Sequence, residues 1–206
     1  MKLLCIMKRF SVVICAVASM SSPVFADTVL APGASWEYMI TDHSVVLPGG
    51  DPSWNTTLGG GWAVGAAPFG NTGSGDFGAN TSWPAGNLLW VRRAVDFSGF
   101  DLSTAHWDLG VDNGFDLYAN GTFVAGANAE GFTFRWEYGG GFGASLHPGV
   151  NIIALALEDH GGATAFDMQI TATAAPAIPE PESYAMLLAG LGLLGFVTRR
   201  RKQRAA

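Results

Sequence analysis

The middle of this chain alternates apolar and polar residues with a period of two, and that pattern limits the fold more than any other feature of the sequence. The alternation covers residues 89–97, 105–112, 132–138 and 166–170. Because successive side chains of a strand point to opposite faces, these segments are predicted to be half-buried β-strands. The run 152–157 is almost continuously apolar and predicts a buried strand.

Turn signals separate these strands. Residues 115–119 run into Asn120-Gly121, a pair typical of type I′ hairpin turns, and Phe123 begins the return strand. Pro148-Gly149 predicts a second turn. Residues 48–87 are rich in Gly, Pro, Asn and Trp and predict long loops with at most one or two strands, one of them at 61–66. Since the body contains no amphipathic helix of ten residues, we predict an all-β fold, an antiparallel jelly-roll-like β-sandwich over residues 27–175.

The N-terminus has the features of a secretory signal peptide. Basic residues at positions 2, 8 and 9 precede an apolar stretch at 10–20, and Val24-Phe25-Ala26 offers small or compact residues of the kind that a signal peptidase reads. We therefore predict a signal peptide at 1–26, cleaved between Ala26 and Asp27, and an exported protein. An N-terminal membrane anchor is the alternative, which the short apolar region disfavours.

Charge is unevenly distributed along the chain. Between residues 27 and 178 there are fifteen Asp and Glu against three Arg, a formal charge of −12, and there is no Lys. Such a field opposes nucleic acids and anionic membrane surfaces, which need clustered Lys and Arg, and an anionic polysaccharide would need a bridging cation. Both cysteines, Cys5 and Cys15, lie in the predicted signal peptide. The mature protein is therefore predicted to lack disulfides, thiolate metal sites and cysteine catalysis.

The C-terminal tail combines an apolar run with a basic cluster. Residues 183–198 carry no charge and as a helix would reach about 24 Å, against roughly 30 Å for a hydrocarbon core. Since the run has no polar face, we predict a transmembrane helix at 184–198, with a buried C-terminal helix as the alternative. The segment 199–206 is predicted to stay cytoplasmic as a membrane stop. Its basic residues are Arg199, Arg200, Arg201, Lys202 and Arg204.

A Pro-Glu-Pro step precedes this helix, in a predicted linker at 176–183. The step consists of Pro179, Glu180 and Pro181, and its prolines keep the chain extended and out of the helix. The order of Pro-Glu-Pro, short apolar helix and arginine cluster resembles the PEP-CTERM sorting tail of exported proteins in Gram-negative bacteria. The resemblance implies transient anchoring in the inner membrane, where an exosortase reads the tail and removes or exchanges it on the way to the cell surface. A proline-rich juxtamembrane linker is the alternative.

The body resembles a second family. The segments LLWVRRAVDF, AHWDLGVDNGFDLYANGTFV and LHPGVNIIALALEDHGGATAFDMQI follow one another as in the galactose-binding-domain-like jelly roll, an accessory module of glycosidases and surface proteins. The resemblance covers residues 36–172. It implies the sandwich fold and, with less specificity, a carbohydrate ligand.

Two sets of loop residues are candidate binding groups. Trp54, Trp83 and Phe69 lie in stretches broken by Gly and Pro, where exposed rings would stack on sugar faces; the alternative is that they cap the open ends of the sandwich. The second set consists of hard oxygen donors in glycine-rich loops, which calcium prefers: Asp51, Asn55, Asp112, Asn113 and Asp116. The alternative for Asp112 and Asn113 is a local turn role, and no other cofactor is predicted. Arg92 and Arg93, neighbours on a strand, are predicted to point to opposite faces and to pair with acids.

No pattern in the sequence supports catalysis. The four histidines show no HExxH spacing, Gly73-Ser74-Gly75 is not a nucleophile elbow, and there is no phosphate-binding glycine loop. We predict a non-catalytic carbohydrate-binding or adhesive module of the cell surface or biofilm matrix, processed by signal peptidase and an exosortase. The alternatives are a self-associating structural matrix protein and a small glycan-active enzyme that uses paired carboxylates, such as Asp112 with Asp116 or Glu158 with Asp159.

Overall fold

The structure, a computed structural model, describes residues 25–71, 78–128, 135–176 and 181–203. The elements in chain order are β1 (Ala26–Leu30), β2 (Ser35–Thr41), the short 3-10 helix η1 (Pro48–Gly50), β3 (Ala63–Ala66), β4 (Phe69–Gly70), β5 (Thr81–Ser82), β6 (Leu88–Asp96), β7 (Phe100–Asp112), β8 (Gly114–Ala119), β9 (Thr122–Ala127), β10 (Tyr138–Gly141), β11 (Val150–Glu158), β12 (Ala165–Ala174) and α1 (Pro181–Gln203).

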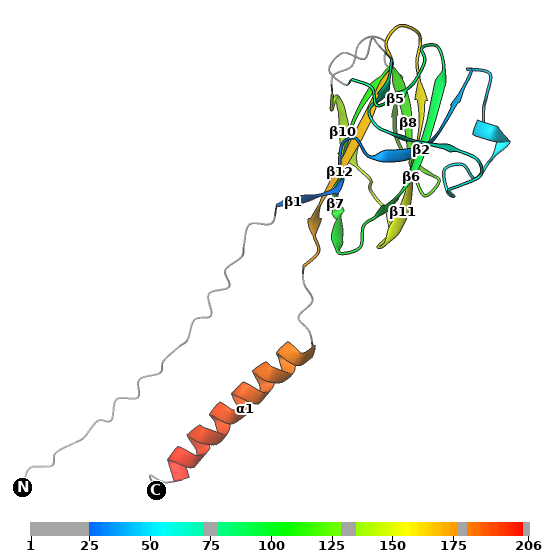
Figure 1. Cartoon of the computed structure of the whole chain (residues 1–206). Helices are drawn as coiled ribbons and strands as arrows, with labels where there is room; N and C mark the ends of the chain where they lie inside the picture. The colour runs from blue at the N-terminus through cyan, green and yellow to red at the C-terminus, as the bar shows by residue number, and fades with distance from the viewer. Residues whose placement is uncertain (1–24, 72–77, 129–134, 177–180, 204–206) are drawn as a thin grey trace, which may run out of the picture.

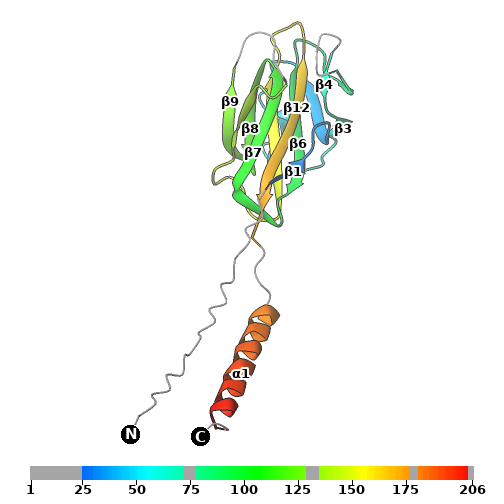
Figure 2. The same cartoon turned by 90° about the vertical axis from the view of Figure 1, so that its left-hand side faces the viewer.

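The described strands form two six-stranded sheets that pack face to face (Figures 1 and 2). Sheet A has the order β10-β7-β12-β4-β5, with β1 also paired to β12, and sheet B has the order β3-β2-β6-β11-β8-β9. The long strands pair antiparallel, whereas the two-residue strands β4 and β5 pair parallel. The predicted all-β, antiparallel sandwich is therefore confirmed.

The main core lies between the two sheets and uses every second residue of the long strands, as the alternation predicted. Its members on the central strands are Leu89, Val91, Trp107, Leu109, Leu117, Ile153, Leu155, Phe166, Met168 and Ile170. Fully burying one such aliphatic or Phe side chain contributes about 1.5–3 kcal/mol to folding. The core clusters draw their members from residues 29–172, so the sandwich has a core that does not depend on the tail.

A second, smaller cluster covers the outer face of sheet B. The connection from β2 to β3 crosses this face and inserts Trp54, whose ring lies 5.0 Å from that of Trp90 and 5.6 Å from that of Tyr118, all edge to face. Ala154 of β11 lies beneath them. This connection is the blue and cyan segment that projects beside β2 and β6 in Figure 1.

Arg92 of β6 holds that connection in place. Its side chain is 1% exposed, and its Nε donates to Glu37 Oε2 at 2.9 Å. Its Nη1 donates to the carbonyl oxygen of Trp54 at 3.2 Å, and its Nη2 donates to the carbonyl oxygen of Gly59. The guanidinium also lies 3.9 Å from the centroid of the Trp62 ring. The predicted pairing of Arg92 with an acid is thus confirmed, and Arg93 instead donates to the Ser35 carbonyl.

Four segments differ from the sequence prediction. The predicted strand at 132–138 is wrong in its described part: residues 135–136 form a turn with Trp136 at φ 64°, and β10 begins only at Tyr138. After Tyr138, β10 consists of three glycines. A Cβ on Gly140 would lie only 3.1 Å from the Trp107 ring, so the close packing of β10 on β7 favours glycine there. Glycines show no alternation of apolar and polar side chains, and the sequence pattern therefore does not mark this strand. Within 48–87, β4 and β5 add pairings beyond the one or two strands predicted. The strands β1 and β2 were not predicted; residues 132–134 lie outside the described residues.

The first and last strands lie side by side at one end of the sandwich. β1 pairs antiparallel with β12, which places Ala26 opposite Thr173 and Asp27 opposite Ala172. The predicted signal-peptide junction and the beginning of the C-terminal linker therefore leave the sandwich from the same end, as Figures 1 and 2 show.

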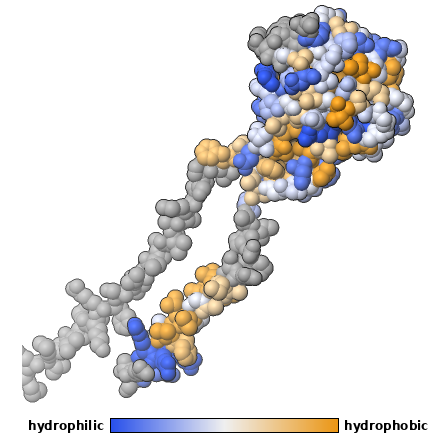
Figure 3. All heavy atoms as spheres, viewed as in Figure 1, coloured by the Kyte–Doolittle hydropathy of each residue, from blue (hydrophilic) through white to orange (hydrophobic). Residues whose placement is uncertain are grey.

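The C-terminal helix α1 is longer than the predicted 184–198, and the prediction that Pro181 stays out of the helix is wrong, because α1 begins at Pro181, where the first turn tolerates proline. It carries exposed apolar side chains from Met186 to Val197, which appear orange in Figure 3, followed by a basic end in blue. The Arg200 guanidinium lies 5.9 Å from the centroid of the Phe196 ring. Over the described part of the chain, no helix is both long enough and apolar enough to cross a membrane, so the transmembrane prediction for 184–198 is not confirmed. Pro179, Glu180 and Arg204 lie outside the described residues.

Candidate functional site

The three aromatic residues predicted to stack on sugars are buried. Trp54 is 5% exposed, and Trp83 and Phe69 are fully buried. Trp83 donates from Nε1 to the Asn87 carbonyl at 3.0 Å, and the Phe69 ring packs 5.2 Å from that of Tyr38. Their assignment as exposed ligand contacts is therefore wrong, because their loops fold back and use the rings as core.

The five predicted calcium ligands lie at separate places. Asp51 Oδ1 accepts bonds from the backbone N–H and the hydroxyl of Ser53, which lower the pKa of this carboxyl. Asn113 Oδ1 accepts from the His160 N–H at the end of β11. Asp112 lies next to Asn113 in a buried corner, Asp116 lies on β8, and Asn55 lies near the β8–β9 turn. Within the described ranges, no group of three or more His, Cys, Asp or Glu side chains could hold a metal ion, so the five-residue site is not formed.

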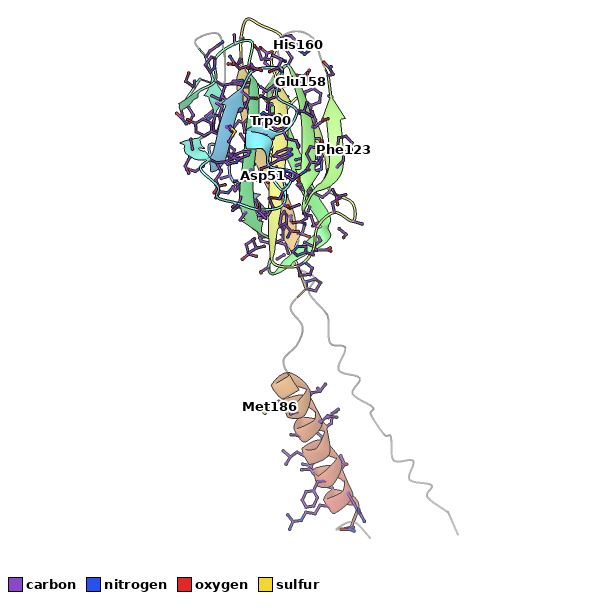
Figure 4. All side chains as sticks on the ribbon, turned by 90° about the vertical axis from the view of Figure 1, so that its right-hand side faces the viewer. Asp51, Trp90, Phe123, Glu158, His160 and Met186 are labelled. Carbon is purple, nitrogen blue, oxygen red and sulfur yellow. The ribbon has the colours of Figure 1, made fainter. Side chains whose placement is uncertain are left out.

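Among the described residues, Phe123 of β9 presents an exposed aromatic ring on the outer face of sheet B. It is 55% exposed, and its ring lies 5.8 Å from that of half-buried Tyr118 on the facing strand β8. Figure 4 looks onto this face, with Trp90 near the centre, Phe123 toward the β9 edge and Glu158 and His160 above. Because Tyr118 also packs on buried Trp54, the Phe123 ring rests on a fixed aromatic support.

Carboxylates lie beside these rings. Asp116 is two residues before Tyr118, so it shares the outer face of β8, and it pairs in register with Ala156 of β11. Glu158 is two residues beyond Ala156, which makes Asp116 and Glu158 diagonal neighbours, a relation that typically separates side chains by about 7–8 Å. His160 Nε2 lies 3.1 Å from Glu158 Oε2. We name Asp116, Tyr118, Phe123, Glu158 and His160 the acid–aromatic patch.

The two carboxylates and the phenol of the patch influence one another. Asp116 is exposed as a residue, but partial desolvation of its carboxyl by neighbouring side chains, and to a smaller extent the negative charge of Glu158, raises its pKa. Burial also raises the pKa of the Tyr118 hydroxyl, with the charge of Asp116 as a smaller cause. The side chains therefore share one local environment, in which negative charge accumulates beside an exposed ring.

Small residues keep this surface open. Ala156 separates the aromatic pair Trp54 and Trp90 from Asp116, and Gly126 of β9 lies between Asp116 and Phe123. A Cβ on Gly126 would clash with Asp116 Oδ1 and would lie 3.3 Å from Cε2 of Phe123. A side chain at position 126 would thus displace both the carboxylate and the ring.

A second pair of acids is buried elsewhere in the sandwich, near the β7–β8 corner. Asp112 is 4% exposed and Asp159 is fully buried. Asp159 Oδ2 accepts from the N–H groups of Gly86 and Gly161, whereas its Oδ1 has no hydrogen-bond partner among the described residues. Burial, followed by the charges of Asp159 and Glu137, raises the pKa of Asp112 to about 6. These acids serve packing and electrostatics at the corner and are not exposed to a ligand.

Sequence reasoning treated the members of the patch separately. From the sequence, Phe123 is predicted only to begin a return strand, and Glu158 is considered only as a possible partner of the neighbouring Asp159. The available signal was the alternation of β8: since Phe115, Leu117 and Ala119 enter the core, Asp116 and Tyr118 must face outward. The pairing of Tyr118 with Phe123 follows a register shift in the hairpin, which alternation does not encode.

Comparison with known families identifies the tail. Residues 177–202 match the model of the PEP-CTERM protein-sorting motif. The match agrees with the tail resemblance found in the sequence and supports an exported protein whose C-terminus is processed by an exosortase. It covers the linker and α1 and does not extend into the sandwich. A search of curated protein sequences finds no match to this chain.

Solved structures resemble the sandwich only distantly. A β-glucuronidase from Bifidobacterium dentium, complexed with coumarin-3-O-glucuronide, has 15% identity and a TM-score of 0.45, covering 68% of this chain and 21% of that one. One from Ruminococcus gnavus has 10% identity and a TM-score of 0.49, with 75% and 30% covered. One from an uncultured Clostridium has 10% identity and a TM-score of 0.47, with 79% and 31% covered. The chain thus spans less than a third of the length of these enzymes, and this distant similarity carries no information on its activity. The tail, by contrast, is similar to the PEP-CTERM protein-sorting motif.

Proposed function

We propose that this protein is an exosortase-sorted surface or matrix protein whose sandwich binds carbohydrate without turning it over. The observation that carries the binding half is Phe123, a large ring exposed on a sheet face and supported by Tyr118. Aromatic faces of this kind stack on the apolar faces of sugar rings, while carboxylates such as Asp116 and Glu158 accept hydrogen bonds from hydroxyl groups. The ligand face lies on sheet B, and the tail leaves from β12 of sheet A.

The sorting half of the proposal has a direct test in the producing cells. Replacing Pro179, Glu180 and Pro181 with alanine removes the Pro-Glu-Pro step of the tail that matches the sorting motif. We expect the altered protein to keep its tail and to remain with the cell membrane, while the unaltered protein loses the tail and reaches the surface. Mass spectrometry of the C-terminal peptide distinguishes the two forms. Identical processing of both would refute the assignment.

The binding half is tested with residues 26–176, which contain the complete core. The isolated sandwich is applied to immobilised polysaccharides, including the exopolymer of the producer, with and without calcium. We expect retention on at least one polymer and about a two- to tenfold loss of affinity for Phe123→Ala, the size expected for one stacking ring. The control is Val64→Ala, which truncates a side chain that is 72% exposed on the opposite edge of sheet B.

The same experiment decides between the proposal and its alternatives. If nothing is retained and the sandwich assembles with itself as its concentration rises, the structural matrix role replaces it. If reducing ends are released from a retained polymer, and Asp116→Asn and Glu158→Gln abolish the release, the body is a glycan-active enzyme.

A further inference from the structure

The inference concerns the charge of the ligand and rests on the proposed carbohydrate binding. Each arginine of the sandwich has a partner that lies away from the acid–aromatic patch. Arg92 binds Glu37 and is buried, Arg93 donates to Ser35, and Arg135 Nη2 lies 2.6 Å from Asp167 Oδ2. Asp167 lies on the outer face of sheet A and is fully buried beneath Arg135. The fixed positive charges of the described sandwich are thus committed elsewhere.

The patch itself carries negative charge with little local compensation. Among the described residues, the cationic group paired with one of its carboxylates is His160, which is positive only when protonated. Asp116 is exposed on the face, next to Phe123 across Gly126. A ligand that stacks on Phe123 therefore brings its substituents within reach of a carboxylate that has no arginine or lysine beside it in the described structure.

An ammonium group satisfies both parts of this surface. It is attracted to carboxylates, and the electron-rich face of an aromatic ring attracts cations as well. A carboxylated or sulfated sugar would instead meet Asp116 and Glu158 at close range and be repelled. A neutral sugar would gain only stacking and hydrogen bonds.

We propose that the acid–aromatic patch recognises glycans that carry free amino groups, with the sugar ring on Phe123 and its ammonium at Asp116 and Glu158. The ligand class is a polymer or oligomer of 2-amino-2-deoxyhexose in which the amine is not acetylated. N-acetylation removes the positive charge and leaves the sugar backbone unchanged, so it isolates the group on which the proposal depends.

The test compares short glucosamine oligomers with N-acetylglucosamine oligomers of equal length, using residues 26–176 and isothermal titration calorimetry. The buffer is near pH 7, so that the carboxylates are ionised while most of the amine is still protonated, and contains about 0.15 M salt, which screens charges more than roughly 8 Å apart. We expect the free amine to bind at least about tenfold more tightly than the acetylated form. Phe123→Ala and Asp116→Asn should each weaken that binding by about two- to fivefold.

Controls separate recognition from attraction of any cation to an acidic protein. Asp96→Asn removes the same charge from an exposed position at the end of β6, and Val64→Ala removes an exposed apolar side chain from β3. Both should bind like the unaltered protein. If Asp96→Asn weakens binding as much as Asp116→Asn does, the attraction is general and the inference is wrong.

The remaining outcomes distinguish this inference from the function on which it rests. Equal or tighter binding of the acetylated oligomer, lost in Phe123→Ala, overturns the amino-sugar assignment and leaves carbohydrate binding standing. Absence of binding to these oligomers and to the polysaccharide panel overturns both.

Discussion

Arg92 ties the connection from β2 to β3 to the sheet face beneath it through several polar contacts made by one side chain. Its guanidinium satisfies Glu37 and the carbonyl groups of Trp54 and Gly59 in one place. Arg92→Met keeps much of the side-chain volume but removes the cationic partner of Glu37, which among the described residues keeps only the Gly59 N–H, and leaves the carbonyls of Trp54 and Gly59 without this donor. Breaking a buried pair in this way costs about 3–5 kcal/mol, and we expect the lower end because the Glu37 side chain is 23% exposed.

Urea unfolding of Arg92→Met, Arg92→Lys and Arg93→Met checks this expectation. Lysine keeps the charge, but its single ammonium nitrogen does not span the three acceptors that the guanidinium nitrogens of Arg92 reach, so Arg92→Lys should lose an intermediate amount of stability. Arg93 is more exposed than Arg92, and its replacement should cost less. An Arg92→Met protein as stable as the unaltered one would show that the connection from β2 to β3 is held by its aromatic rings alone.

Asp112 gives the sandwich a particular dependence on pH. Its pKa is about 6 in the folded protein, against 3.8 for a free carboxyl, because burial and the charges of Asp159 and Glu137 oppose ionisation. The folded state therefore binds this proton more tightly than the unfolded state does. The resulting stability is fully present below about pH 4 and is lost as pH rises through about 6. Exposed acids with lowered pKa, such as Asp96, act in the opposite sense at lower pH.

Melting temperatures measured between about pH 4 and pH 8 test this statement. The unaltered protein should lose stability across that range relative to Asp112→Asn, which cannot ionise, and Asp112→Asn should be the more stable of the two at neutral pH. Asp96→Asn serves as the exposed control. If the difference between the unaltered protein and Asp112→Asn does not change with pH, Asp112 is already ionised at low pH in the folded state.

Among the elements, the β8–β9 hairpin determines where Phe123 lies. Its turn residues Asn120 and Gly121 have φ of 51° and 79°, the left-handed region that the predicted type I′ turn requires. The Asn120 side chain donates to Asn151 Oδ1 at 2.8 Å and accepts from the Ile152 N–H at 2.9 Å, which ties the turn to β11. The prediction of this hairpin from Asn-Gly was therefore correct, and the turn has a tertiary role as well.

Gly121→Ala should lower the free energy of unfolding by more than the cost of placing alanine at a positive φ, because a steric clash adds to that cost. Alanine at positive φ costs about 1 kcal/mol. The new Cβ would also lie 2.6 Å from Cγ2 of Thr56, in the connection that covers sheet B. The control is Gly143→Ala, at φ 58° with nothing within 4 Å of its Cβ. Thr56→Ser, which deletes Cγ2, should recover the excess loss in urea unfolding; failure to recover it would place the strain elsewhere.

The strands that could be predicted are those whose two faces have different surroundings. β7 and β12 alternate cleanly because one face enters the core and the other carries residues such as Asp108 and Gln169. β2 was missed since its outer face carries Met39, which is itself covered, so the polar half of the alternation is weakened. The prediction of an exposed Trp54 is wrong for a different reason. The sequence of a loop does not show which sheet face the loop covers, and this loop buries Trp54 against sheet B.

For the whole molecule, sandwich and tail should be independent in stability. The core ends at Ala172, before the linker and α1. Deleting residues 177–206 should therefore leave the melting temperature within about 1 °C, a shift that corresponds to a few tenths of a kcal/mol or less. Deleting 26–30 should lower it clearly, because β1 supplies buried Leu30 and a ladder to β12. Differential scanning calorimetry compares the forms, and a large loss on tail removal would reveal a contact between α1 and the sandwich.

The pairing of β1 with β12 has a mechanical consequence. In the surface role proposed above, a protein held by its C-terminus would take up drag through the strand that leads to the tether, which in this chain is β12. That strand is flanked by β7 on one side and by β1 and β4 on the other. Pulling along it loads these ladders in shear, so many hydrogen bonds must break together before the strand slides. Unfolding under force is governed by the unfolding rate and not by equilibrium stability. A tether that leaves from an interior strand would therefore slow forced unfolding of the sandwich and keep the folded protein attached for longer under flow.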